Sequence, residues 1–171
     1  MLVRDARTED APALARLLTQ LGYPVDATTL ARRLQRVRQS GDRVLVACVD
    51  EEPAGLAHLH VAAAIEHDGP AGKLGALVVD ERHRRRGVGR ALVDAIEAAA
   101  RSAGCAQLFL TTAERRADAH AFYESVGFEQ TGRRYTKRFA LQQPLQADRE
   151  TGRKRLEPFE REQDAGHERL T

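Results

Sequence analysis

Residues 73–93 read KLGALVVDERHRRRGVGRALV and give the clearest indication of the fold. It begins with an apolar run that ends at Ala76–Val79, passes through a strongly charged turn, and reaches Gly87-Val88-Gly89. Beyond the glycines, apolar residues recur with the period of an amphipathic helix. The stretch therefore predicts a strand, a tight turn and a helix in that order.

The start of this helix has the composition of an anion site. Gly87 and Gly89 carry no Cβ, so a ligand can come close to the main-chain N–H groups around Val88. A helix N-terminus favours negative charge. Positive side chains cluster at the same place, namely Arg84, Arg85, Arg86 and Arg90. The turn therefore predicts a pyrophosphate site; a basic turn that only caps the helix is the alternative.

The spacing excludes two common phosphate loops. A triphosphate loop has Lys-Ser/Thr after its second glycine, and a dinucleotide fingerprint has a third glycine. This sequence has Arg90-Ala91 and then Leu92 there. The string instead resembles the acetyl-coenzyme A signature of the GNAT superfamily of N-acetyltransferases, Gln/Arg-x-x-Gly-x-Gly/Ala, with Arg84, Gly87 and Gly89 in the three defining places.

A second resemblance to the same superfamily lies further along the chain. Residues 119–128 read AHAFYESVGF, which is similar to the superfamily's Ala-x-x-Φ-Tyr-Glu-x-x-Gly-Phe element. The matching residues are Ala119, Phe122, Tyr123, Glu124, Gly127 and Phe128. Because both motifs occur in the expected order, the chain is identified as a member of the GNAT superfamily.

Periodicity and turn residues divide the rest of the chain into elements. Strands are expected at residues 2–6, 44–49, 54–65 and 107–112, and the central strand is expected to end at Val79. A last pair of strands is expected to run through Tyr135 and Phe139 to Leu141. Helices are expected after a cap at Thr8, after a cap at Asp26, from about Arg90 and after Asp118. The resemblance implies an α+β (α/β) fold, with a mixed, mostly antiparallel sheet, a splayed parallel strand pair and about four flanking helices.

Length and composition predict one domain. Residues 1–141 are expected to form the GNAT-like domain, and the charged residues 142–171 a tail that is flexible or packed on a partner subunit. The net charge is only +2, so neither nucleic acid nor a membrane is expected as partner, although nucleic-acid binding through the arginines is an alternative. We expect a cytoplasmic protein with Cys48 and Cys105 as buried free thiols.

The resemblance implies a reaction and several site residues. Acetyl-CoA is the expected cosubstrate, its arm bound by main-chain groups of Leu77, Val78 and Val79, with an N–H near Val79 stabilising the oxyanion. A primary amine, on a small molecule or a protein, attacks the thioester through a tetrahedral intermediate. Tyr123 is the expected general acid, because a phenol of pKa about 10 can protonate a departing thiolate.

Two histidines on one strand are candidates for the general base. His58 and His60 lie two apart on one strand, so both point to the same face and could line an acceptor pocket. Gly75 and Ala76 stand where relatives often carry an acid, so the base is expected to be one of the two histidines or a water chain. No third ligand accompanies the histidines, so no metal is expected.

Three further expectations concern roles that the motifs leave open. Arg116 stands where relatives often carry an asparagine, and its side chain could reach a phosphate of the cosubstrate, with His120 as support. A non-catalytic acyl-CoA-binding module that regulates a partner is the alternative to an enzyme. By resemblance, a homodimer through the last hairpin or the tail is possible.

Overall fold

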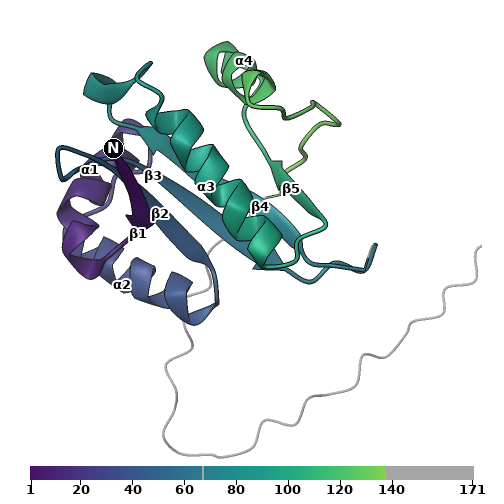
Figure 1. Ribbon diagram of the computed structural model, residues 1–171, viewed down its shortest axis with the longest axis horizontal. Coiled ribbons are helices and arrows are strands. Elements are labelled where there is room, and N and C mark those ends of the chain that lie inside the picture. Colours follow the sequence, from purple (N-terminus) through teal and green to yellow (C-terminus); the bar gives the residue numbers. More distant parts are fainter. Residues whose placement is uncertain (67, 138–171) are drawn as a thin grey trace, which may run out of the picture. The chain divides into compact units, whose positions relative to one another are not determined.

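The structure, a computed structural model, describes residues 1–66 and 68–137. Five strands and four helices occur in this part of the chain, with 3₁₀ turns at Thr8–Asp10 and Glu81–His83 (Figure 1). Their order is β1 (Leu2–Asp5), α1 (Ala11–Gln20), α2 (Ala27–Gln39), β2 (Arg43–Val49), β3 (Glu52–Ala62), β4 (Ala71–Val79), α3 (Val88–Ser102), β5 (Gln107–Leu110) and α4 (Ala117–Ser125).

The strands form a single mixed sheet in the order β1-β2-β3-β4-β5. Neighbours up to β4 are antiparallel, and β5 is parallel to β4. The parallel pairing runs only from Ala71 opposite Gln107 to Leu74 opposite Leu110, although β4 continues to Val79. The mixed sheet and the splayed parallel pair are therefore confirmed.

A β-bulge interrupts β4 at the place where β5 leaves it. On β3, His58 lies opposite Ala76 and Leu59 lies opposite Leu74, so Gly75 is an extra residue without an opposite partner. The bulge reverses the alternation of side chains along β4. Leu74 packs into the same cluster as α3, whereas Ala76 and Val78 pack into the cluster of α1 and α2.

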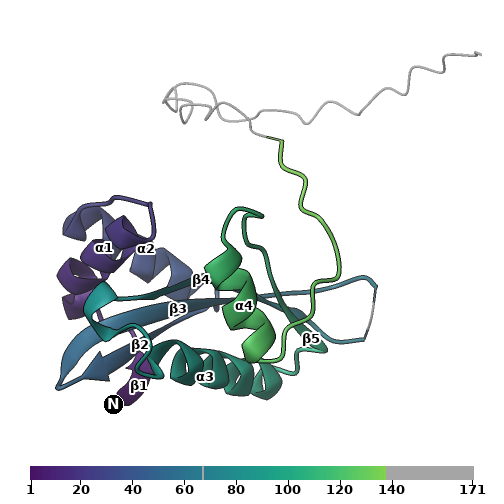
Figure 2. The same cartoon turned by 90° about the horizontal axis from the view of Figure 1, so that it is seen from above.

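Apolar side chains cover the two faces of the sheet separately. Helices α1 and α2 lie on one face and α3 lies on the other (Figure 2). Leu14, Leu17, Leu30 and Leu34 pack against Val46 and Leu56 on the first face, and Leu92, Val93 and Ile96 pack against Leu45, Ala57 and Leu59 on the second. Burying each such side chain contributes roughly 1.5–3 kcal/mol, so both faces are firmly held.

The predicted helix caps have different outcomes. Asp26 does cap α2, because its Oδ1 accepts from Thr29 N at 2.8 Å. The prediction for Thr8 is wrong, since α1 begins only at Ala11 and Thr8 opens a 3₁₀ turn. The reason is Asp10, which is buried and accepts hydrogen bonds from Arg4 at 2.7 and 2.8 Å and from Arg7 N at 2.7 Å. These contacts hold the acidic turn ahead of the helix.

Two strand predictions are also corrected. Strand β3 ends at Ala62, and Ile65 lies in a loop with its side chain 97% exposed. The last strand pair is wrong for its described part, because residues 126–137 form neither helix nor strand. The stretch from Glu129 to Arg134 contains no apolar residue, so it has no face to bury against the sheet. Phe139, Leu141 and the predicted tail 142–171 lie outside the described residues.

The chain divides into two compact units, Met1–Arg134 and Tyr135–Thr171, and every element named above lies in the first. Cys48 is a buried free thiol as expected, whereas the free thiol of Cys105 is only partly buried. Within residues 1–66 and 68–137, no helix has the length and apolar character to cross a membrane.

Candidate active site

The N-terminus of α3 leaves main-chain donors without acceptors inside the helix. The first intrahelical bond runs from Ala91 N to Gly87 O at 3.0 Å, so the N–H groups of Val88, Gly89 and Arg90 have no intrahelical acceptor. The residue before the helix is Gly87, which has no side chain that could cap them. Three such N–H groups at a helix N-terminus can hold a phosphate group.

The two glycines have different surroundings. Gly87 adopts a left-handed φ of +80°, and a Cβ there would meet nothing within 4 Å, so the space in front of the helix is open. A Cβ on Gly89 would lie 3.2 Å from Cζ of Phe122. Gly89 therefore also lets the ring of Phe122, on α4, pack against the first turn of α3.

The arginines of the turn differ in their contacts. Arg85 and Arg86 are exposed. Arg84 donates from Nε to the carbonyl of Val79 at 3.3 Å, and Arg90 donates from Nη2 to the carbonyl of Ser125 at 2.8 Å. Arg90 thus ties α3 to the end of α4, a structural contact that the sequence did not indicate.

The main chain of β4 turns alternately toward β3 and away from it. Asp80 N donates to Ala54 O at 2.8 Å, so the alternation of an antiparallel pair directs the N–H groups of Leu77 and Val79 away from β3. That is the side on which β5 has left β4. By the same alternation, Val78 directs its main chain toward β3.

Tyr123 lies on α4, with its ring packed in an edge-to-face manner. The ring centroids of Phe122 and Phe128 are 5.4 and 5.9 Å from that of Tyr123. Burial raises the pKa of the Tyr123 hydroxyl above its ordinary value of 10.0, although the positive charge of Arg116 opposes this. The hydroxyl therefore keeps its proton at neutral pH and can act as a proton donor.

His120, rather than Arg116, makes the contact that holds the residues just before α4. Arg116 is the exposed residue that precedes α4. His120 lies one turn into the helix, and its Nε2 is 3.1 Å from the carbonyl oxygen of Ala113. This contact fastens the loop before α4 to the helix itself. A contact of Arg116 with a phosphate remains a prediction.

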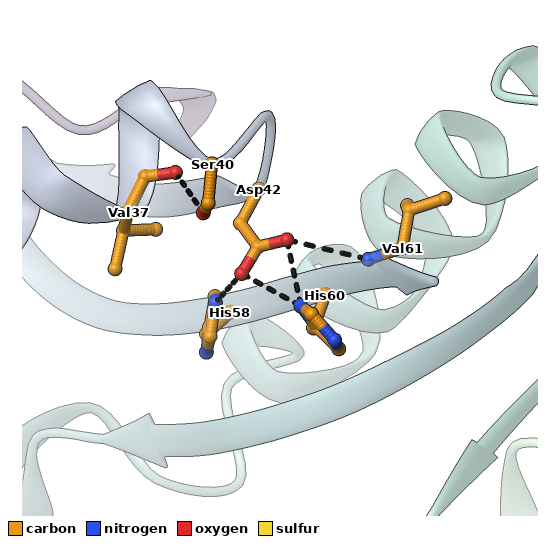
Figure 3. Close-up of polar contacts among 6 residues, drawn as sticks. All are labelled: Val37, Ser40, Asp42, His58, His60 and Val61. Atoms are coloured by element: carbon orange, nitrogen blue, oxygen red, sulfur yellow. Dashed lines mark hydrogen bonds and ion pairs between the residues drawn. The ribbon is translucent and has the colours of Figure 1, made fainter. Parts of the chain in front are cut away.

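His58 and His60 meet a carboxylate on the face of α1 and α2. Figure 3 shows Asp42 pointing between the two imidazoles. His58 Nε2 lies 3.3 Å from Asp42 Oδ2, and His60 Nδ1 lies 2.8 Å from each carboxylate oxygen. Val61 N donates to Asp42 Oδ1 at 3.4 Å. The side chain of Asp42 is only 9% exposed, so this carboxylate is well shielded from water.

The sequence analysis did not single out Asp42 and missed its contacts with the two histidines. The strand that follows Asp42 indicates the direction of its side chain. Asp42 and Val44 are two residues apart, so their side chains point to the same face, and Val44 packs toward α1 and α2. Finding these contacts also required the register of β2 against β3, in which Arg43 lies opposite Leu59. That register puts Asp42 beside His60. Among the described residues, no three His, Cys, Asp or Glu side chains are arranged to hold a metal ion.

These features lie around the point where β4 and β5 part. An uncapped helix N-terminus faces open space, main-chain N–H groups point into the gap, and a protonated tyrosine packs on the α3 face. The two histidines approach from the opposite face. Such an arrangement suits an acyltransferase that binds a pyrophosphate-containing thioester.

Comparison with known proteins identifies the family. The model of the acetyltransferase (GNAT) family matches residues 9–128, and the chain belongs to this family. It is an acetyl-CoA-dependent N-acetyltransferase. The alternative of a non-catalytic acyl-CoA-binding module is therefore set aside.

Relatives with curated names support this assignment. Aminoglycoside N(6')-acetyltransferase type 1 of Stenotrophomonas maltophilia is 34% identical over 140 residues, which cover 77% of this chain and 88% of the relative. Aminoalkylphosphonate N-acetyltransferase of Salmonella typhimurium is 35% identical over 86 residues, which cover 50% and 56% of the two chains.

Solved structures share the fold. An acetyltransferase from Trypanosoma brucei superposes with a TM-score of 0.70 at 25% identity, covering 81% of this chain and 99% of the other. Glucosamine-6-phosphate N-acetyltransferase from Arabidopsis thaliana gives a TM-score of 0.69 at 22% identity, covering 81% and 98%. At this identity the second likeness concerns the fold alone.

Proposed function

We propose that the protein transfers the acetyl group of acetyl-CoA to a primary amine of a small molecule by direct attack, with Tyr123 as general acid. The observation that carries the proposal is the uncapped N-terminus of α3 beside the gap between β4 and β5. The gap offers a path for the pantetheine arm, and the helix offers donors for the pyrophosphate.

The cosubstrate is held mainly by the main chain in this proposal. The N–H groups of Val88, Gly89 and Arg90 bind the pyrophosphate, and the exposed Arg85 and Arg86 add positive charge. The N–H groups of Leu77 and Val79 bind the pantetheine arm, and the one at Val79 stabilises the oxyanion. Val78 contributes less than the sequence suggested, because its main chain faces β3.

The chemistry needs one proton donor and one proton acceptor. As the amine nitrogen bonds to the carbonyl carbon, a base takes a proton from that nitrogen. The C–S bond then breaks, and the thiolate takes the hydroxyl proton of Tyr123. A raised pKa keeps that proton in place until the thiolate forms. His58 and His60 are the candidate bases.

The acceptor class is suggested by the relatives. Their names describe acetylation of aminoglycosides and of aminoalkylphosphonates, and the aminoglycoside enzyme matches over most of its length. Both substrates are small molecules with an aliphatic amino group. We therefore expect an aliphatic amine rather than a protein N-terminus.

Release of thiol from acetyl-CoA, measured with a panel of aminoglycosides, aminoalkylphosphonates and alanine-ended peptides, tests the proposal. We expect turnover with at least one small amine, and a product heavier by one acetyl group. Turnover confined to the peptides would overturn the acceptor assignment. Tight binding of acetyl-CoA with no thiol release from any amine would count against the whole proposal.

A further inference from the structure

The carboxylate of Asp42 determines which nitrogen of each neighbouring histidine carries a proton. Burial disfavours the charge of Asp42, but the hydrogen bond and charge of His60 and the N–H of Val61 outweigh burial, so the pKa of Asp42 lies below its ordinary value. Asp42 is therefore ionised at neutral pH. An ionised carboxylate can only accept hydrogen bonds, so each imidazole nitrogen that faces it must be a donor.

The two histidines face the carboxylate with different nitrogens. His58 uses Nε2 and His60 uses Nδ1 (Figure 3). A neutral imidazole has one protonated and one bare nitrogen. In its neutral form, His58 is consequently protonated at Nε2 and bare at Nδ1, and neutral His60 is protonated at Nδ1 and bare at Nε2. One carboxylate thus holds two histidines in opposite tautomers.

The bare nitrogen of His58 lies at the bulge of the central strand. A Cβ built on Gly75 would be 2.8 Å from Nδ1 of His58 and 3.5 Å from its Cε1. The imidazole therefore fills the space that a side chain at residue 75 would need. Gly75 is also where β4 and β5 stop pairing, so Nδ1 lies beside the gap assigned above to the thioester.

We propose that Asp42 is a positioning residue which, by holding Nε2 of His58, presents the bare Nδ1 of that ring as the proton acceptor for the attacking amine. The proposal deepens the proposed function and rests on it. During the reaction His58 takes the amine proton at Nδ1 and becomes an imidazolium, whose charge Asp42 stabilises. After product release, the proton returns to solvent through the partly exposed ring. His60 supplies the second hydrogen bond that fixes the carboxylate.

Nitrogen-15 NMR of the imidazole rings tests the tautomers without any substrate. In the wild type we expect neutral His58 with its proton on Nε2 and neutral His60 with its proton on Nδ1. Asp42→Asn should give both rings mixed tautomers, whereas Asp94→Asn, the same change at an exposed site on α3, should leave them as in the wild type. The same tautomer in both histidines of the wild type would overturn the proposal.

Steady-state kinetics test the catalytic consequence. His58→Gln should lower kcat about 100-fold, the usual contribution of a general base, and Asp42→Asn should lower it at least about tenfold through the wrong tautomer. The KM for acetyl-CoA should stay close to wild type in both, because neither residue contacts the N-terminus of α3. An unchanged kcat in Asp42→Asn overturns the proposal. If no amine reacts with the wild type, the proposed function fails, while the NMR result still decides the tautomers.

Substitution of Gly75 provides an independent test of the position of His58. Gly75→Ala should displace the imidazole and lower kcat about tenfold or more, with little loss of stability, since a ring can move more easily than a backbone. Gly132→Ala is the matched control, because a Cβ there would meet nothing within 4 Å. In a His58→Gln background, Gly75→Ala should have no further effect on kcat. Additive losses in the double variant would contradict the assigned position of Nδ1.

Discussion

The two faces of the sheet contribute to the site in different ways. On the α3 face, the groups come from three short continuous segments, residues 77–79, 84–90 and 119–128, and most of the donors are main-chain N–H groups. On the α1 and α2 face, the groups are the side chains of Asp42, His58 and His60. The two histidines follow Asp42 in the chain by 16 and 18 residues.

This difference has a physical consequence. A helix N-terminus spreads its positive character over several N–H groups and nearby arginines, so each contributes only about 0.3–1 kcal/mol when exposed. The cluster on the other face depends on one shielded carboxylate that serves two rings. We therefore expect single substitutions on the α3 face to weaken cosubstrate binding gradually, except at Tyr123, where one atom carries one chemical step.

The largest effect is expected for Tyr123→Phe. Loss of the hydroxyl should lower kcat about 100-fold or more and leave the Kd of acetyl-CoA unchanged, because the ring packing is kept. Since burial raises the pKa of Tyr123 above 10.0, the wild type should lose activity only at more alkaline pH, and the variant should lack this limb. Tyr135→Phe, at a side chain that is 91% exposed, is the matched control. A wild-type kcat in Tyr123→Phe would remove its assigned role.

A second effect distinguishes backbone strain from anion binding at α3. Gly87 and Gly104 flank the two ends of the helix with φ of +80° and +74°, and neither has an atom within 4 Å of its Cβ position. Alanine at either site should cost about 1–2 kcal/mol of stability, but only Gly87→Ala should also raise the Kd of acetyl-CoA, by about tenfold. Calorimetric titration and thermal unfolding measure the two quantities. Equal Kd values in the two variants would show that Gly87 is not at the pyrophosphate site.

A smaller effect separates the arginines that the sequence grouped together. Arg86→Ala should raise the Kd of CoA about two- to fivefold at low salt, corresponding to about 0.3–1 kcal/mol, and the difference should shrink at high salt. Arg90→Ala should instead lower the free energy of unfolding by about 0.5–1.5 kcal/mol, because its hydrogen bond to Ser125 O joins α3 to α4. A salt-sensitive binding defect in Arg90→Ala, with unchanged stability, would reverse these roles.

The smallest effect concerns Asp80, the buried carboxylate at the end of β4. The hydrogen bonds of Arg82 hold the pKa of Asp80 at about 2, below its ordinary 3.8, despite the opposing effect of burial. Its contribution to stability is therefore present above about pH 4 and is lost as the pH falls through about 2. The difference in thermal midpoint between wild type and Asp80→Asn should shrink as the pH is lowered from 6 to about 2. The difference in thermal midpoint is small at every pH, because the side chain of Arg82 is 74% exposed and its charge is screened by solvent. A difference that grows toward acid pH would contradict this.

Much of the fold could be predicted because its signals are local. The apolar periodicity of residues 14–21 and 88–100, the Asp26 cap and the Gly87 turn each arise within a few neighbouring residues. Two of the errors have different causes. Asp10 binds Arg4 on β1, six residues earlier, and this contact moved the start of α1. No strand forms between Glu129 and Arg134, because this stretch has no apolar side chain to bury against the sheet.

The amino-acid sequence alone was enough to predict the class of protein, the strand, turn and helix around residues 73–93, and the position of Tyr123 on a helix that follows the sheet. It did so because helix termini, glycine turns and short motifs depend on contacts between near neighbours. The three-dimensional structure was needed to show that Gly75 forms a bulge, that Asp42 joins His58 and His60, and that Arg90 binds α4. These contacts depend on strand register and on helix packing, and a shift of one residue in register would send each side chain to the opposite face.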